Sequence, residues 1–435
     1  MSGPFSPALS AYLALSRIAA PVAPVLLRRR AAKGKEDLAR LGERLGQSYP
    51  ARPASPVIWL HGASVGEGVS LLPLIDALAR PASGPAPFCL LTTGTLTSAR
   101  LLAPRLAGIE GRAAHAFVPV DTARAVAGFL DHWAPDLAIW CESEFWPRLM
   151  VETAARGTPM MLVNARLSAS SAEGWARVPG MARRLVRLFD RIVTQDRETA
   201  ERLLALGADP AGLREGGNLK RLLPPPEADA TALRVAADAL GERPRWLAAS
   251  THDPEEGAVI AAHAALKAHR PALVTLLAPR HPERAEGIAA AGRAAGLTVT
   301  QRSHGEGPPS PGGLWIVDTL GEMGLWYRLA PVAFVGGSFA PMGGHNPFEP
   351  VALDAAILTG RDTRNFAPDY EALAAADGVV MLEAPDDLAA AVARLLDDVA
   401  EREAQIARAR RVFDAGRPDL ARLRDEALAL MRASR

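Results

Sequence analysis

The chain has few cysteines. Its 435 residues include only Cys89 and Cys141, far apart and each inside an apolar run. Two such cysteines exclude a disulfide framework and a cysteine-based zinc site, which is typical of a protein in a reducing compartment. The nine histidines show no HExxH or similar ligand spacing. The sequence therefore predicts no metal centre.

An excess of charge of either sign is also absent. The chain carries 49 Lys and Arg against 48 Asp and Glu, a formal net charge of +1. This balance argues against a nucleic-acid partner bound by bulk charge. Hydrophobic residues make up 49% and charged residues 22%, which are proportions of a folded globular protein and exclude global disorder. The length predicts two or three domains.

One short segment departs from this neutrality. Residues 1–45 contain eight basic and three acidic side chains. From Phe5 to Leu27 the chain is mostly apolar and long enough to span a bilayer, but Arg17 and three prolines interrupt it. An arginine near the centre of a span costs ~3 kcal/mol on insertion scales, so a simple spanning helix is disfavoured.

A helix over this segment would be amphipathic. One side would carry Ser6, Ser10, Arg17, Pro21 and Arg28. The opposite side would carry Leu15, Ile18, Val22, Val25 and Leu26. This division favours a helix in the membrane interface, with the basic run 28–35 over anionic headgroups. A cleaved signal peptide is disfavoured because no early basic region precedes the apolar stretch. A helix packed on its own domain stays open as an alternative.

The rest of the chain alternates short apolar runs with amphipathic stretches, twice over. The first half contains PVIWLHG, FCLLTTG, AHAFVPV, DLAIWCE, PMMLVNA and DRIVTQ, and the second contains RWLAAST, ALVTLLAPR, LWIVDT, VAFVGGS, AAILTG and GVVMLE. Such alternation predicts α/β domains, each with a parallel sheet and helices on both faces.

A run of three prolines, residues 224–226, is the clearest linker signal. We expect an N-terminal membrane-associated segment, two Rossmann-like doubly wound domains facing a cleft, and a last helix, broken near Pro418, that packs back on the first domain. The expected bounds are 1–45, 46–223, 227–416 and 417–435.

The first loop with distinctive polar chemistry is HGASVGEG, residues 61–68, between a predicted strand and a predicted helix. Its glycines allow close backbone approach, and free amides at a helix start favour an anion or a polar substrate. It lacks both GxGxxG and the lysine of a P-loop, so those modes of nucleotide binding are not supported. Glu67 either takes part in chemistry or only complements the helix dipole.

The second loop is CESEFWPRL, residues 141–149, again at the end of a predicted strand. On an extended chain, Glu142 and Glu144 would point the same way and repel each other unless paired with a cation. They could form an acid–base pair, but structural ion pairing is favoured, with Arg166 of the next loop as the candidate partner.

Two more loops stand out in the second half. In APRHPER, residues 278–284, Arg280 follows a strand, where a guanidinium suits phosphate. His281 equally fits a solvated helix start. In FVGGSFAPMGGHNPFEP, residues 334–350, two glycine pairs and Asn346 precede a helix whose first turn contains Glu349. Amides there suit a phosphate, and the carboxylate suits ribose hydroxyls.

Taken together, these motifs resemble those of a known family. HGASVGEG, ESEFWP, NARLS, STHDPEE, APRHPER, DTLGEMG and GGHNPFEP occur in the same order in the Kdo transferases of lipopolysaccharide synthesis. The resemblance covers nearly the whole chain and includes RLGERLG, residues 40–46. Several separate motifs in one order are far more specific than any one of them.

The resemblance implies an inverting glycosyltransferase of the GT-B fold that moves 3-deoxy-D-manno-oct-2-ulosonic acid (Kdo) from CMP-Kdo to a lipid A precursor. It implies that Glu67 is the catalytic base and that Arg280, Asn346 and Glu349 bind CMP. It also implies attachment to the cytoplasmic face of the inner membrane. We expect no metal or other cofactor.

Further residues are expected around the two substrates. On the donor side, His281 and the amides at Gly321, Glu322, Gly337 and Ser338 would stabilise the leaving phosphate. The acceptor-side candidates are Ser64, Gly66, Glu142, Glu144, Arg166 and Lys220. The Lys220 assignment stands apart because the family's usual aromatic and acidic continuation of GNLK is replaced here by Arg221 and Leu222.

Two rival hypotheses remain at this stage. Another GT-B enzyme that uses a nucleotide sugar, a transferase or an epimerase, would share the two-domain layout but has no place for the SVGE and ESEFWP pair. A non-catalytic hinged binding protein would also have two α/β lobes, but it would normally carry an export signal, which the sequence lacks.

Overall fold

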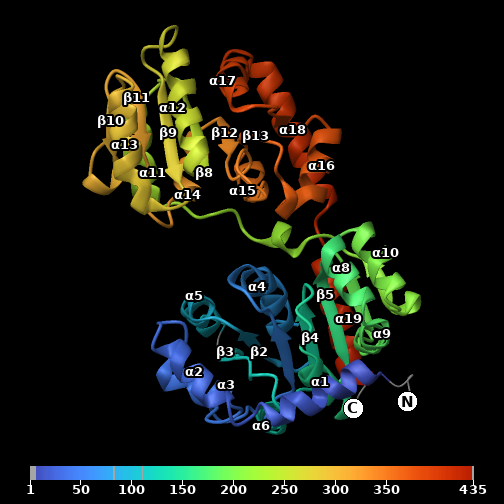
Figure 1. Cartoon of the computed structure of the whole chain (residues 1–435). Coiled ribbons are helices and arrows are strands. Elements are labelled where there is room, and N and C mark those ends of the chain that lie inside the picture. The colour runs from blue at the N-terminus through green and yellow to red at the C-terminus, as the bar shows by residue number, and fades with distance from the viewer. Residues whose placement is uncertain (1–5, 82–83, 110, 434–435) are drawn as a thin grey trace. The chain divides into compact units, whose positions relative to one another are not determined.

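The computed structural model describes residues 6–81, 84–109 and 111–433 (Figure 1). Phe5, the first residue of the predicted apolar stretch, and residues 434–435 of the predicted last helix lie outside the described residues. The chain forms two compact units. Unit 1 comprises Met1–Leu223 with Arg417–Arg435, and unit 2 comprises Pro224–Gly416. The proline run thus lies at the start of unit 2.

Unit 1 contains a seven-stranded sheet in the order β3-β2-β1-β4-β5-β6-β7, with every neighbouring pair parallel. The strands are β1 (Val57–His61), β2 (Phe88–Thr93), β3 (Ala113–Phe117), β4 (Leu137–Cys141), β5 (Met160–Ala165), β6 (Arg191–Thr194) and β7 (Leu213–Glu215). The six predicted strands are confirmed. The sequence missed β7, because this short edge strand reads Leu-Arg-Glu and contains no apolar run.

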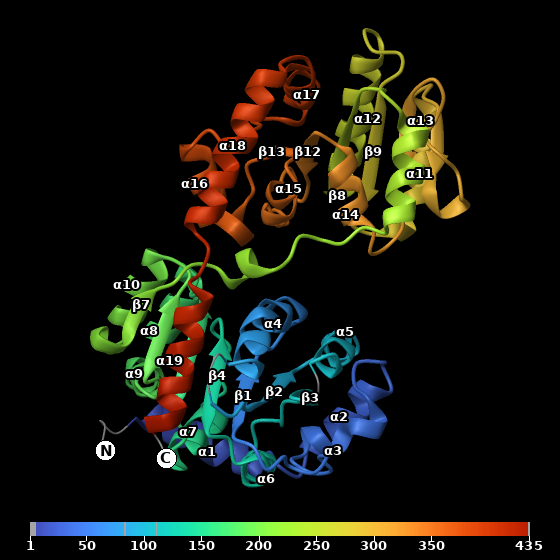
Figure 2. The same ribbon diagram turned by 180° about the vertical axis from the view of Figure 1, so that it is seen from behind.

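The helices of unit 1 cover both faces of this sheet (Figures 1 and 2). They are α1 (Pro7–Ile18), α2 (Ala23–Ala31), α3 (Leu41–Arg44), α4 (Val65–Ala79), α5 (Leu96–Ala107), α6 (Ala123–Trp133), α7 (Pro147–Ala155), α8 (Ala169–Ala176), α9 (Pro179–Val186), α10 (Arg197–Ala205) and α19 (Leu420–Ala433). Helix α4 begins inside the HGASVGEG segment, because Ser64 caps it by accepting the N–H of Glu67.

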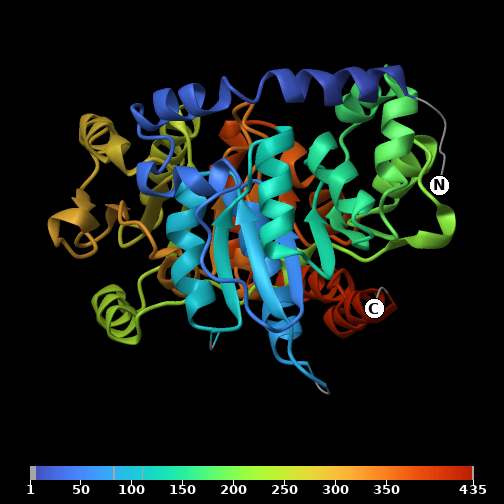
Figure 3. The ribbon, with the colours of Figure 1, turned by 90° about the horizontal axis from the view of Figure 1, so that it is seen from below.

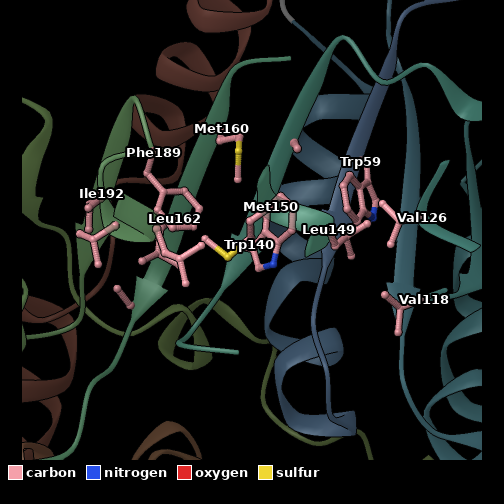
Figure 4. Close-up of a cluster of buried hydrophobic side chains, with 14 of the residues drawn as sticks. Trp59, Val118, Val126, Trp140, Leu149, Met150, Met160, Leu162, Phe189 and Ile192 are labelled. Atoms are coloured by element: carbon pink, nitrogen blue, oxygen red, sulfur yellow. The ribbon is translucent and has the colours of Figure 1, made fainter. Parts of the chain in front are cut away.

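The core of unit 1 lies on both sides of the sheet because alternate strand residues point to opposite faces. On one face Trp59 and Trp140 meet edge to face, with ring centroids 4.7 Å apart, under α6, α7 and α9 (Figure 4). On the other face, Ile58 and Ile139 pack with α4, α5 and α19. Strands buried on both faces explain why these segments appear as continuous apolar runs.

Unit 2 contains a second seven-stranded parallel sheet, in the order β10-β11-β9-β8-β12-β13-β14. Its strands are β8 (Arg245–Thr251), β9 (Val274–Pro279), β10 (Val299–Gln301), β11 (Gly313–Ile316), β12 (Val332–Val335), β13 (Ala356–Thr359) and β14 (Val380–Met381). The six predicted strands are confirmed, and the sequence missed only the short edge strand β10. The predicted pair of doubly wound domains is therefore correct.

Helices also flank both faces of the unit 2 sheet. They are α11 (Ala230–Leu240), α12 (Asp253–Lys267), α13 (Ala285–Ala294), α14 (Met323–Leu329), α15 (Phe348–Ala352), α16 (Ala367–Ala375), α17 (Leu388–Asp397) and α18 (Val399–Ala415). The last predicted helical stretch is broken between α18 and α19, as expected from Pro418. Helix α19 belongs to unit 1, where it lies beside α4 (Figure 2), and its Glu426 pairs with Arg214 of β7 at 2.7 Å.

One face of α1 packs on unit 1. Leu9 is buried, and the hydroxyl of Tyr12 donates to Oδ2 of Asp121 at 2.7 Å. Nε of Arg148 in α7 donates to the hydroxyl of Ser16, also at 2.7 Å. The alternative of a helix packed on its own domain is therefore right for this face.

The other face of the two N-terminal helices is exposed. Figure 3 shows α1 and α2, in dark blue, following one another along one side of unit 1. Leu15, Ile18, Val22, Val25 and Leu26 are all about half exposed or more. Among the described residues, no single helix is both long and apolar enough to cross a bilayer. Helices α1 and α2 meet that test only as a pair, which is bent by 71°.

The RLGERLG segment fastens these helices to the sheet. Glu36 is buried between two arginines, with Nε of Arg30 at 2.8 Å and Nε of Arg44 at 3.5 Å. Gly46, at a φ of +74°, approaches α6 so closely that a Cβ there would lie 2.2 Å from the carbonyl oxygen of Ala125. A side chain at this position would push the segment away from α6.

Candidate active site

The loop after β1 holds the carboxylate of Glu67 in place. The N–H of Ala63 donates to Oε2 of Glu67 at 2.9 Å, and the hydroxyl of Ser64 donates to Oε1 at 2.9 Å. Gly62 leaves room for this turn, because a Cβ there would lie 3.0 Å from the Cβ of Glu67. The carboxylate is thus oriented at the carboxyl edge of the sheet, where ligands of parallel α/β domains bind.

Glu67 is suited to accept a proton. Its side chain is largely buried, and burial raises its pKa, as does the negative charge of Glu142 and, less strongly, that of Glu144. The bonds from Ala63 and Ser64 act in the opposite direction but do not cancel the shift. A carboxylate with a raised pKa is a stronger base than an ordinary one. The exposed Ser64 and Gly66 lie on the open side of this loop.

The second acidic loop differs from the expectation of an extended chain. Glu142 adopts a φ of +60°, so the chain turns directly after β4 and the extended chain assumed for Glu142 and Glu144 is not present. Nζ of Lys220 lies 3.4 Å from Oε1 of Glu142. Lys220 thus belongs to the same cluster as Glu67 and Glu142. Arg166, the candidate partner proposed from the sequence, follows β5 directly.

Sequence reasoning missed the residue that places Lys220. Asn164, at the end of β5 with a φ of +53°, accepts the N–H of Leu219 through its side-chain oxygen at 2.9 Å. This bond fixes the short helical turn Leu219–Leu222 against the sheet. The apolar pattern predicts where a strand lies, but it does not show that a non-glycine residue within the strand has a positive φ, so Asn164 was not predicted.

In unit 2 the glycine-rich turn after β12 differs from what the sequence suggested. The N–H groups of Gly337 and Ser338 donate to the carboxylate of Glu255, at 2.7 and 2.8 Å. Glu255 is fully buried. Both amides, which the sequence predicts to receive the leaving phosphate, therefore donate to a side chain of the chain itself in this structure.

Cationic and imidazole groups gather beside that turn. Arg280 directly follows β9, and its side chain is exposed. The His252 ring lies between two others, with ring centroids 5.7 Å from His281 and 5.2 Å from His345. Arg280 and His281 thus both lie at the carboxyl edge of the sheet, directly after β9, as predicted. Sequence reasoning missed His252 and His345.

The remaining donor-side candidates lie in loops at the same edge. Glu322, next to Gly321, pairs with Arg302 at 3.0 Å, so its carboxylate is engaged within unit 2. The side-chain oxygen of Asn346 accepts the N–H of Phe348 at 3.0 Å and thereby starts α15. Glu349 in that helix is partly buried, and burial raises its pKa while Asn346 opposes the shift.

The described residues contain no group of three or more His, Cys, Asp or Glu side chains placed to hold a metal ion. The groups placed at the two sheet edges can transfer a proton, at Glu67 in unit 1, and bind an anion, at Arg280 in unit 2.

Comparison with known proteins identifies similar chains. A family model described as 3-deoxy-D-manno-octulosonic-acid transferase (kdotransferase) matches residues 39–222. The 3-deoxy-D-manno-octulosonic acid transferase of Bordetella pertussis is 38% identical over 88% of this chain and 90% of its own length. The transferase of the same description from Haemophilus influenzae is 33% identical over 84% of this chain and 85% of its own.

Solved structures add evidence on the fold alone. UDP-GlcNAc 2-epimerase from Neisseria meningitidis superposes with a TM-score of 0.59, covering 86% of this chain and 99% of the epimerase. Its sequence is 13% identical. Such a likeness establishes a shared two-unit architecture and nothing about the reaction.

Proposed function

The chain belongs to the family of 3-deoxy-D-manno-octulosonic acid (Kdo) transferases, and on that premise we propose that Glu67 is the base of the transfer and that unit 2 binds the CMP part of the donor. The chain is a glycosyltransferase of the GT-B fold that transfers Kdo from CMP-Kdo in lipopolysaccharide synthesis. The raised pKa of the oriented, largely buried Glu67 carboxylate is the observation that supports the assignment of the base.

The reaction proposed for Glu67 is a single displacement. Its carboxylate takes the proton from an acceptor hydroxyl as that oxygen attacks the anomeric carbon of Kdo, opposite the leaving CMP. The anomeric configuration is inverted, and the transition state has oxocarbenium character. The N–H of Ala63 and the hydroxyl of Ser64 keep the carboxylate in one orientation, so little reorganisation is needed at the moment of transfer.

On the donor side, we propose that Arg280 supplies a positive charge for the phosphate of CMP. Asn346 and Glu349, at the start of α15, are proposed to bind the nucleoside. A guanidinium can bind two phosphate oxygens at once. We propose that such groups, without a metal ion or other cofactor, neutralise the leaving phosphate. The rival hypotheses of an epimerase or a binding protein have no support in the sequence relatives, which are Kdo transferases.

We further propose a lipid A precursor as acceptor and the cytoplasmic face of the inner membrane as the site of reaction. The exposed apolar row of α1 and α2 supports this location, since it lies next to the exposed Arg17, Arg28 and Arg29. Apolar side chains flanked by basic ones favour the interface of an anionic bilayer.

The experiment is an incubation of the purified protein with CMP-Kdo and tetra-acylated lipid A precursor, with the products read by mass spectrometry. A mass gain of one or more Kdo units is expected from the wild type and none from Glu67→Gln. The variant should keep its affinity for CMP within about twofold, because the Glu67 carboxylate is hydrogen-bonded to Ala63 and Ser64 of unit 1, whereas CMP is proposed to bind unit 2. Transfer by Glu67→Gln at near the wild-type rate would show that another residue is the base.

A further inference from the structure

A buried carboxylate occupies the amides of the glycine-rich turn in unit 2. Oε1 of Glu255 accepts the N–H groups of Ser338 at 2.8 Å and Phe339 at 3.0 Å. Oε2 accepts those of Gly337 at 2.7 Å and His252 at 3.0 Å. Converging backbone N–H groups of this kind form an anion-binding nest. Here the anion is a side chain from the first turn of α12.

The turn is shaped around that carboxylate. A Cβ at Gly336 would lie 2.8 Å from Oε2 of Glu255, and Gly337 has a φ of +70°. A Cβ at Gly337 would also lie 2.9 Å from the ring of His345. The two glycines are thus needed for the close approach of Glu255 and His345. Because Glu255 accepts the hydrogen bonds of the turn's amides, these amides have an anionic partner without an external phosphate.

Side chains beside the nest are placed to bind an anion instead. Nε2 of His252 lies 3.0 Å from Nε2 of His345, and the planes of the two rings differ by 9°. Burial lowers the pKa of His345 to about 4, with His252 and Arg280 adding to the shift, so both rings are neutral near pH 7. Of two neutral rings joined through Nε2, one always keeps a proton on Nδ1 and can donate it.

Two neighbouring arginines differ in what they contact. Arg284 pairs with both Asp253 and Glu256 and is therefore neutralised. For Arg280, by contrast, no carboxylate lies within ion-pair distance in the part of the chain that the structure describes, and its side chain is exposed. Arg280 is thus the charge available for a ligand at this edge of the sheet.

We propose that Glu255 is a positioning residue that fills the amide nest in place of a ligand anion, and that the donor's phosphate is bound by the side chains of Arg280, His252 and His281. This inference rests on the proposed function for the identity of the donor. It replaces backbone recognition of the phosphate, which the glycine-rich sequence suggested, with recognition by side chains held around an internal carboxylate.

The test measures binding of CMP and of cytidine to the full chain by calorimetry. Arg280→Lys keeps the charge but loses the guanidinium fork, so it should weaken CMP binding about tenfold and leave cytidine binding unchanged. Arg284→Lys is the matched control, because Arg284 is paired with Asp253 and Glu256. This substitution should leave the affinities for CMP and for cytidine unchanged. Equal losses of CMP affinity in the two variants would overturn the assignment of Arg280.

A second comparison addresses the nest. Glu255→Ala should weaken CMP binding, and millimolar formate should restore it by refilling the empty nest. If the amides were the phosphate site, this variant would bind CMP more tightly than the wild type and formate would compete with CMP, which would overturn the inference. Should Glu255→Ala fail to fold, the comparison of Arg280→Lys with Arg284→Lys still decides whether side chains bind the phosphate.

The two proposals fail in different ways. A wild type that does not bind CMP would overturn the proposed donor. A wild type that binds CMP with an affinity that none of the variants changes would overturn only the inference about Glu255 and Arg280.

Discussion

The ammonium group of Lys220 lies 3.4 Å from Oε1 of Glu142, at the edge of the unit 1 sheet where Glu67 is also held. Both partners are only about one-fifth exposed. The pair reduces the repulsion between Glu142 and Glu67 without abolishing it, since Glu142 still raises the pKa of Glu67. Glu142 therefore adds to the effect of burial in raising the pKa of the proposed base.

The charge of Glu142 should affect the pH dependence of activity. A base acts only when deprotonated, so activity rises with pH through the pKa of Glu67 in the free enzyme. Glu142→Gln removes a negative charge, lowers that pKa and should move the acid limb of the kcat/KM profile to lower pH. Glu144→Gln is the matched control, with a smaller shift in the same direction, because Glu144 contributes less. A limb that moved to higher pH in either variant would contradict this account of Glu67.

Ser64→Ala should act in the opposite direction. The Ser64 hydroxyl donates to Oε1 of Glu67 and lowers its pKa, so removing it raises the pKa and should move the acid limb to higher pH. Ser64 also caps α4, and its loss should cost about 1 kcal/mol of stability in urea denaturation. Ser64→Thr keeps the hydroxyl and should restore both quantities. A Ser64→Ala protein with an unchanged pH profile would mean that this hydrogen bond does not tune the base.

The sequence allowed most strands and the order of elements to be predicted because buried parallel strands are continuous apolar runs. Trp59 and Trp140 lie in two such runs and pack on the same face. The short edge strands β7 and β10 escaped prediction, whereas β3 and β14, which also lie at sheet edges, were predicted. Strand β7 was missed because it reads Leu-Arg-Glu and contains no apolar run. The exact start of α4 was not predicted either, because its N-cap, Ser64, lies inside the segment that the sequence marked as a loop.

The site was predicted in part. Motif order pointed to Glu67 and Arg280, but the contacts between loops depend on backbone turns that no spacing rule encodes. Glu142, for example, leaves β4 with a φ of +60°, and this turn decides that it meets Lys220. Likewise, a glycine-rich turn indicates an anion but not its source, and here Glu255 is the source.

A further prediction concerns the buried charges that fasten α2. The side chain of Glu36 is 1% exposed and pairs with Arg30 and Arg44. Glu36→Gln leaves the buried Arg44 without its counter-charge, and breaking a buried pair in this way costs about 3 kcal/mol. Arg30→Gln is the control and should cost less than about 1 kcal/mol, because Arg30 is half exposed. Urea denaturation of both variants measures the two costs, and equal values would mean that Arg44 does not depend on Glu36.

The last prediction tests the membrane surface. Ile18 is 74% exposed and Leu15 is 64% exposed, on the side of α1 that does not contact unit 1. Replacing both with serine removes apolar area at a cost to bilayer binding of roughly 25 cal/mol per Å², without touching the Tyr12 and Ser16 contacts that hold α1. The double variant should keep its thermal stability but bind vesicles containing anionic phospholipid more weakly in a sedimentation assay. The matched control, Leu204→Ser on the exposed side of α10, should bind as the wild type does. Equal binding of all three proteins would show that the exposed row of α1 is not the membrane contact.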